Sequence, residues 1–304
     1  MCCDGEVTST DAASDPIRPS LSDEDLAQLR EVATQIAVEA AAFVRRRRAE
    51  VFGDTTDNSA GEGTVRAKST PTDPVTVVDT ETERLLRDRL AQLRPGDPVL
   101  GEEGGGPAAG GVSPGAVTWV LDPIDGTVNF VYGIPAYGVS VAARVDGVSV
   151  AGAVADVVSG EVYSAALGQG AALDGPAGRK ALHCNAVDDL SMALLGTGFG
   201  YDRAQRAQQG ALLAKVMPSV RDVRRIGSAA LDLCMVGAGR LDVFYEHRLN
   251  VWDWAAGALV AAEAGAVMLL PNAPADLMVA AAPGVAQQFQ AVLERSGGLD
   301  PVGE

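Results

Sequence analysis

The sequence reads Trp119-Val120-Leu121-Asp122-Pro123-Ile124-Asp125-Gly126-Thr127-Val128-Asn129-Phe130 near the middle of the chain. An apolar run typical of a strand ends here in two aspartates, and Pro123 between them favours an interruption of strand pairing. The turn can direct both carboxylates and the Ile124 carbonyl toward one point, which suits a cation that prefers oxygen ligands. Gly126 allows a ligand to approach the backbone closely, and the Gly126 and Thr127 amides can bind phosphate oxygens. Taken alone, such a segment is more often an ordinary polar turn.

Two further acidic segments strengthen the cation interpretation. Glu102 and Glu103 follow the apolar pair Val99-Leu100, and Asp253 stands in the first turn of a predicted apolar helix. Carboxylates flanked by apolar residues need partners. Each segment also has a simpler interpretation, because Asp253 can cap the helix dipole and Glu103 can be a solvated surface acid.

The composition is that of a folded chain rich in carboxylates. Its 304 residues are 47% hydrophobic and 21% charged, which excludes wholesale disorder. The formal net charge of −16 gives no electrostatic support to direct nucleic-acid binding. His183 and His247 are the two histidines of the sequence, so a His-rich zinc or copper site is disfavoured and hard cations are favoured.

The sequence also bears on location and domain organisation. No apolar run reaches the roughly 18 residues of a membrane span, and no secretory signal precedes the four cysteines. We therefore expect a cytoplasmic protein with reduced thiols and no membrane association. Cys234, in an apolar helical run, is expected to be a buried hydrophobe. Residues 1–20, with Cys2 and Cys3, are predicted to be a disordered tail ahead of one domain at 21–304.

Periodicity and capping signals predict the order of helices and strands. A helix begins at Ser22 and ends near the basic run 45–48, which we interpret as a solvated helix end, and a loop follows at 53–65. The capping-box spacing of Thr80 and Glu83 predicts a second helix over 81–93, with Asp79 just ahead of it. The predicted strands are 117–121, 138–145, 148–157, 161–166 and 241–245, and the later helices are 228–239 and 252–264. This order predicts a layered α/β fold (α+β layered), not a bundle or an all-β sandwich.

Four segments together resemble the inositol monophosphatase family, the lithium-sensitive, Mg²⁺-dependent phosphatases, and most of all its bacterial inositol-1-monophosphatases. They are Asp73-Pro74-Val75-Thr76-Val77-Val78-Asp79, Gly101-Glu102-Glu103, Asp122 to Phe130, and Trp252-Asp253, in family order over residues 25–295. The resemblance implies an alternating αβαβα sandwich and commonly a homodimer. Gly104 stands where many relatives have serine, and Val128 replaces a common threonine. Neither position supplies an implied metal ligand.

The resemblance also implies two or three Mg²⁺ ions per subunit. By similarity, the metal ligands are Glu102, Asp122, the Ile124 carbonyl, Asp125 and Asp253, with Asp122 bridging two ions. Such ions would explain how an acidic chain binds an anionic phosphate.

The implied chemistry is attack by metal-activated water, without a phosphoenzyme. The catalytic residues carried over from the family are Asp79, Glu102 and Thr127. The Thr127–Asp79 pair would orient the water, and Glu102 would act as both ligand and base.

The family pattern implies one set of substrate contacts. They are Glu102, Ile124, Asp125, Gly126, Thr127, Arg224, Gly227, Ser228, Ala229, Glu246 and Asp253. The segment 124–127 would surround the phosphate, while Glu246 and Asp253 would contact inositol hydroxyls. Ser228 could instead be a plain N-cap. Lys68 would lie near the metals or be an ordinary solvated lysine.

The implied function is hydrolysis of inositol 1-phosphate to myo-inositol and phosphate. Fructose 1,6-bisphosphate, histidinol phosphate and 3'-phosphoadenosine 5'-phosphate remain alternative substrates. Glu246 favours a small phosphorylated polyol over a nucleotide, which would need an apolar slot for its base. A regulatory protein that binds a protein partner is the alternative from another class. The complete set of implied ligands favours an active phosphatase.

Overall fold

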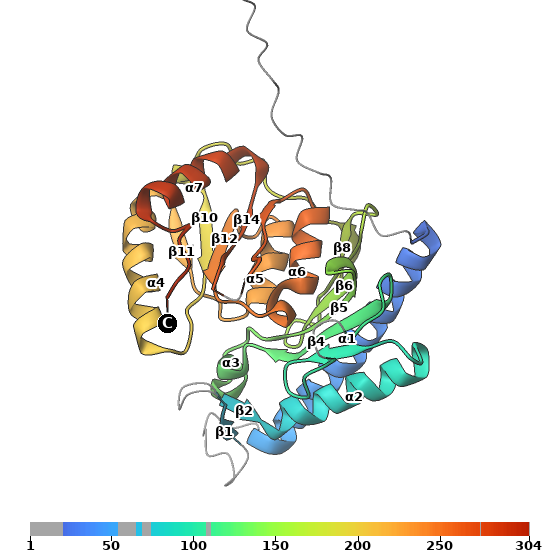
Figure 1. Ribbon diagram of the computed structural model, residues 1–304. Coiled ribbons are helices and arrows are strands. Elements are labelled where there is room, and N and C mark those ends of the chain that lie inside the picture. Colours follow the sequence, from blue (N-terminus) through green and yellow to red (C-terminus); the bar gives the residue numbers. More distant parts are fainter. Residues whose placement is uncertain (1–20, 54–64, 69–73, 108–110, 274, 304) are drawn as a thin grey trace, which may run out of the picture.

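The computed structural model describes residues 21–53, 65–68, 74–107, 111–273 and 275–303. Two sheets and the helices around them form alternating layers (Figure 1). The predicted tail at 1–20, with Cys2 and Cys3, and most of the predicted loop at 53–65 lie outside these residues. Among the described helices, none is both long and apolar enough to cross a membrane.

The larger sheet has seven strands in the order β3-β4-β5-β6-β7-β8-β9. Their bounds are β3 Val99–Gly101, β4 Val117–Asp125, β5 Gly138–Val145, β6 Val148–Asp156, β7 Val162–Ala166, β8 Ala171–Gly175 and β9 Gly178–Ala181. β3 pairs with β4 in parallel, and the other neighbours are antiparallel. The central strands are buried along most of their length because helices cover both faces.

The smaller sheet has five strands in the order β11-β10-β12-β14-β13. Their bounds are β10 Leu194–Thr197, β11 Asp222–Arg224, β12 Val243–His247, β13 Val267–Leu269 and β14 Leu277–Ala281. β10 pairs in parallel with both β11 and β12, while β14 is antiparallel to β12 and β13. A separate pair, β1 Val65–Ala67 and β2 Pro74–Thr76, is antiparallel.

The helices make three layers around these two sheets (Figure 1). Their bounds are α1 Asp23–Phe52, α2 Val77–Leu93, α3 Thr127–Tyr132, α4 Arg203–Val216, α5 Ala229–Gly237, α6 Val251–Glu263 and α7 Pro283–Ser296, with short 3₁₀ turns η1 Leu190–Met192 and η2 Met217–Ser219. α1 and α2 pack on one face of the larger sheet, α5 and α6 lie between the sheets, and α4 and α7 cover the far face of the smaller sheet. This arrangement confirms the predicted αβαβα sandwich.

The first two helices differ from their predicted bounds. α1 continues beyond its arginine run to Phe52, and the run is not a purely solvated end. Arg45 Nε donates to the Val157 carbonyl at 2.8 Å, and Arg48 Nε donates to the Phe130 carbonyl at 3.0 Å. These contacts hold the end of α1 against the larger sheet and the turn that follows β4.

α2 begins one turn earlier than predicted. Thr76, not Thr80, caps the helix, and Asp79 completes a capping box with it. Glu83 is instead buried, and its carboxylate accepts the amides of Glu103 and Gly104 at 2.7 and 2.8 Å. Asp79 therefore lies inside the first turn of α2, at a fixed position beside the larger sheet.

Candidate active site

The end of β4 carries the first group of predicted site residues. β4 continues through Pro123 to Asp125, whereas the sequence predicted an end at Leu121. Its pairing with β5 shifts register between Asp122 and Asp125. Pro123, which has no N–H to donate, lies in this irregular part and so costs the sheet no regular hydrogen bond. The Ile124 amide donates instead to Asp122 Oδ1 at 3.0 Å.

Gly126 converts this strand end into α3. Its φ is 100°, and a Cβ atom there would lie 3.0 Å from the carbonyl oxygens of Ala136 and Gly227. Asn129 Nδ2 donates to the carbonyls of Ala136 at 2.7 Å and Ile226 at 2.9 Å. The turn after β4 is thereby fixed against the segment that precedes α5.

Asp79 and Thr127 are in contact, although they lie 48 positions apart in the sequence. Thr127 Oγ1 is 3.1 Å from Asp79 Oδ1 and 3.0 Å from the Ile124 carbonyl oxygen. Thr76 donates to Asp79 Oδ2 from its hydroxyl at 2.5 Å and from its amide at 2.9 Å. Burial raises the pKa of Asp79 to about 6, against the opposing effect of these hydrogen bonds.

Glu102 and Glu103 share Lys68 as a cationic partner. Lys68 Nζ lies 2.7 Å from Glu102 Oε1 and 2.5 Å from Glu103 Oε1. Burial raises the pKa of Glu102 to about 7, although the Lys68 charge acts in the opposite direction. Lys68 is thus an ion-pair partner of both acids and not merely a solvated side chain.

Asp125 joins the β4 turn to the start of α5. Its Oδ2 accepts from Ser228 Oγ at 2.6 Å and from the Ala230 amide at 2.7 Å. Ser228 is also the predicted N-cap of α5, since its hydroxyl accepts the Leu231 amide at 3.3 Å. Burial raises the pKa of Asp125 to about 6, and the Ser228 hydrogen bond opposes this shift.

Asp253 enters the same region from α6. It occupies the predicted first turn, and its Oδ2 accepts the Asn250 amide at 2.6 Å. Burial first, and then the negative charges of neighbouring acids, raise the pKa of Asp253 and of Asp122 well above the ordinary range. Ionising these acids together is costly unless a cation joins them.

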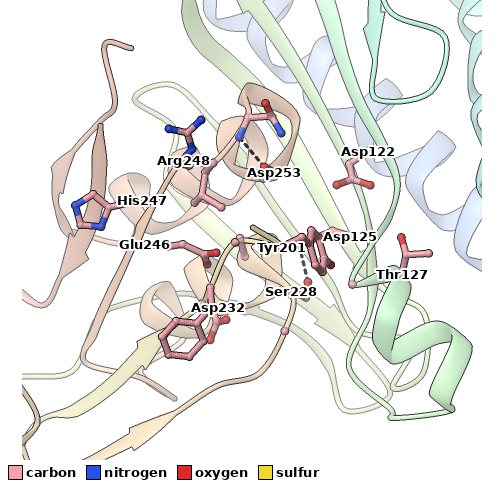
Figure 2. Close-up of a pocket in the computed structure, with 18 of the residues that line it drawn as sticks. Asp122, Asp125, Thr127, Tyr201, Ser228, Asp232, Glu246, His247, Arg248 and Asp253 are labelled. Carbon is pink, nitrogen blue, oxygen red and sulfur yellow. Dashed lines mark hydrogen bonds between the residues drawn. The ribbon is translucent and has the colours of Figure 1, made fainter. Parts of the chain in front are cut away.

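These residues line one cavity of about 390 Å³ between the two sheets. Figure 2 shows Asp122, Asp125 and Thr127 on one side of it, facing Glu246 and Asp232 on the other. The predicted site residues that line it are Glu102, Asp122, Ile124, Asp125, Gly126, Thr127, Gly227, Ser228, Ala229, Glu246 and Asp253, together with Lys68. Asp79 is not among the lining residues, but it contacts Thr127, which is. Burial raises the pKa of Glu246 to about 8, although the Arg225 charge opposes the shift.

Arg224 does not line this cavity, and the adjacent Arg225 does. Arg224 belongs to β11, and its guanidinium lies 2.7 Å from the Asp222 carboxylate in a different hollow of the surface. Successive side chains of an extended segment point to opposite sides, so one position decides which arginine reaches the cavity. The structure therefore places Arg225, and not the predicted Arg224, at this cavity, while the predicted substrate contact of Arg224 stays a prediction.

The donor set fits hard divalent cations in its chemistry, because it consists of carboxylates and a backbone carbonyl. In the described part of the chain, however, no group of three or more His, Cys, Asp or Glu side chains stands arranged to hold an ion. Glu102 points to Lys68, and Asp125 is engaged by Ser228. Glu102 would therefore have to turn from Lys68 to bind an ion, whereas Asp125 Oδ1 is not used by Ser228.

Several cavity residues were missed by the sequence analysis. They are the segment 198–202, Gln205, Arg225, Asp232 and the segment 247–250. Asp232 gave one signal, as a single acid in the otherwise apolar helix α5. Apart from Gln205 in α4 and His247 at the end of β12, the remaining positions come from loops, whose approach to the cavity depends on how the sheets pack.

Comparisons with known proteins show which family this chain resembles. The model of the inositol monophosphatase family matches residues 25–295. Inositol-1-monophosphatase of Mycobacterium leprae is 69% identical over 289 residues, which cover 93% of this chain and 99% of the relative. The solved structure of Mycobacterium tuberculosis SuhB has a TM-score of 0.77 and 60% identity, and the match covers 91% of this chain and all of that one.

A more distant relative carries a different name. The Nus factor SuhB of Pseudomonas aeruginosa is 39% identical over 200 residues, which cover 64% of this chain and 72% of that protein. The family model, the relatives that match nearly the whole chain and the shared fold lead to one conclusion. The chain belongs to the inositol monophosphatase family.

Proposed function

We propose that this protein is a Mg²⁺-dependent phosphomonoesterase that hydrolyses inositol 1-phosphate to myo-inositol and phosphate. The observation that carries the proposal is one cavity in which Glu102, Asp122, Asp125 and Asp253 converge beside the Thr127–Asp79 pair. The similarity to inositol-1-monophosphatases extends over nearly the whole length of both chains, and it supports the choice of substrate. A homodimer, which the family resemblance also implies, stays a prediction.

Mg²⁺ would be held by the acidic half of the cavity. Glu102, Asp122 and the Ile124 carbonyl form one implied donor set, and Asp122, Asp125 and Asp253 form the second. Bound there, Mg²⁺ supplies neutralisation of phosphate charge and activation of water. The raised pKa values of these acids support the assignment, because the buried carboxylates lack sufficient positive charge.

The chain's own residues orient the attacking water and accept its proton. Thr127 has one hydroxyl proton, which it donates to Asp79 Oδ1 or to the Ile124 carbonyl, so an oxygen lone pair is left to accept a hydrogen bond from water. Glu102, which also lines the cavity, would accept the proton that water loses.

The opposite end of the cavity would hold the polyol. Glu246 and Asp253 can accept hydrogen bonds from ring hydroxyls, while the Gly126 and Thr127 amides lie on the phosphate side. This division of the cavity would leave the phosphate ester bond between the two groups of residues.

Phosphate release from a panel of substrates tests the proposal. The panel is inositol 1-phosphate, fructose 1,6-bisphosphate, histidinol phosphate and 3'-phosphoadenosine 5'-phosphate, each with Mg²⁺ and with a chelator. We expect Mg²⁺-dependent release with a preference for inositol 1-phosphate. Asp125→Asn should abolish turnover and keep the fold, whereas Asp242→Asn, a buried aspartate outside the cavity, should retain turnover.

A regulatory role with a protein partner is the second candidate. It rests on the similarity to the Nus factor SuhB of Pseudomonas aeruginosa. If none of the esters of the panel is hydrolysed, although calorimetry demonstrates Mg²⁺ binding, this candidate would be favoured over the phosphatase.

A further inference from the structure

Asp232 is a buried acid that lines the cavity and has no role in the proposed hydrolysis. It lies on α5 between Leu231 and Leu233, and its side chain is 1% exposed. The residue lines the cavity, and its Oδ1 has no hydrogen-bond partner among the described residues. Buried polar atoms are nearly always hydrogen-bonded, so this carboxyl group has an unused capacity to accept a hydrogen bond beside the cavity.

Two glycines make the space that Asp232 and Glu246 occupy. A Cβ atom on Gly196 would lie 3.0 Å from Asp232 Oδ1, and one on Gly198 would collide with the Glu246 carboxyl group. The two glycines are two positions apart along one extended segment and so face the same side. A larger residue at either glycine would displace the neighbouring carboxyl group. The two glycines therefore leave room for Asp232 and Glu246 beside β10.

The positive charge of Arg225 acts on both acids. Burial raises the pKa of Asp232 well above its ordinary range, the Glu246 charge raises it further, and the Arg225 charge opposes these shifts. Figure 2 shows Asp232 and Glu246 close together, on the side of the cavity opposite Asp122 and Thr127. A carboxyl pair with one guanidinium offers both hydrogen-bond acceptors and donors to a ligand.

We propose that Asp232 accepts a hydrogen bond from a ring hydroxyl of the substrate beside Glu246, and so helps the site to select phosphorylated cyclic polyols with neighbouring ring hydroxyls. The inference rests on the proposed function and assigns Asp232 a part in it. A buried carboxyl without a hydrogen-bond partner destabilises the folded chain, and a substrate hydroxyl would satisfy it. A ring without hydroxyls would leave both carboxyl groups without ligands and would therefore bind poorly.

The test compares two substrates that share a six-membered ring. Inositol 1-phosphate carries ring hydroxyls, and cyclohexyl phosphate lacks them. We expect Asp232→Leu to reduce the ratio of their kcat/KM values about 10- to 100-fold, the effect of losing a hydrogen bond to a charged or strongly polar group, mainly through a higher KM for inositol 1-phosphate. Asp232→Asn, which retains an acceptor, should reduce the ratio less. The matched control Asp242→Asn should leave the ratio unchanged.

The outcomes separate the two levels of the proposal. An unchanged ratio in a folded Asp232→Leu variant would overturn the reading role of Asp232 while leaving the phosphatase in place. An equal loss on both substrates would also overturn it, because a purely structural role affects both alike. Should Asp232→Leu fail to fold, the ratio measured with Asp232→Asn decides the matter. Wild-type protein that hydrolyses neither ester would refute the proposed function itself.

Discussion

Glu246 should make the metal-free protein less stable as the pH rises. The pKa of Glu246 is about 8 in the folded chain against an ordinary value of 4.5, because the side chain is largely buried. The folded state therefore holds the proton more tightly than the unfolded state, and stability falls as the pH rises from 4.5 toward 8. At about 1.4 kcal/mol per pKa unit the difference corresponds to about 5 kcal/mol, which partial exposure reduces to about 3 kcal/mol.

Denaturant unfolding of wild type and Glu246→Gln in the presence of a chelator measures this effect. Between about pH 5 and pH 9, wild type should lose about 3 kcal/mol more than the variant, whose amide does not titrate. Glu161→Gln is the control: Arg240 lowers the pKa of Glu161, so this acid is ionised in both states over that range and its removal should leave the slope unchanged. Parallel curves for wild type and Glu246→Gln would refute the reasoning.

Three further predictions concern the catalytic pair, the cavity arginine and the anchoring of α1. Thr127→Val should lower kcat about 100-fold with little change in KM, because the hydroxyl acts on water and not on the ester; steady-state kinetics measures both values. Arg225→Gln should raise the KM for inositol 1-phosphate about 10-fold, whereas Arg224→Gln should change it less than about twofold; equal effects would contradict the assignment of the cavity cation to Arg225. Arg48→Met should lower the free energy of unfolding by about 1–2 kcal/mol, since Arg48 donates to the Phe130 carbonyl and lies over its ring; an unchanged denaturation midpoint would contradict this role.

The fold was predictable wherever local signals agreed with the packing. The strand prediction 138–145 matches β5, and Ser228 and Asp253 stand at the helix starts predicted for them. α2 was less predictable because Thr76/Asp79 and Thr80/Glu83 have the same capping-box spacing. The amides of Glu103 and Gly104 bind Glu83, and this long-range contact selects the earlier start.

The candidate site divides in the same way. Its acidic half was predictable because the motif around Asp122 and Asp125 is continuous in sequence. The half that we propose to hold the polyol depends on Asp232, Arg225 and Gly198, which separate elements bring together. For Arg225 the assignment requires knowing which side of an extended segment faces the cavity, and a shift of one residue reverses that choice, as Arg224 illustrates.

The hydrogen bonds from Ser228 and Ala230 to Asp125 connect the larger sheet mechanically to the helix layer between the sheets. Both use the same oxygen, Oδ2, so Oδ1 can take up a ligand while the connection to α5 persists. Any displacement of Asp125 on ligand binding is then transmitted to α5, and through its packing on β12 to the wall that carries Glu246. One carboxylate thus couples the two halves of the cavity, through its hydrogen bonds to the start of α5 and the packing of α5 against β12.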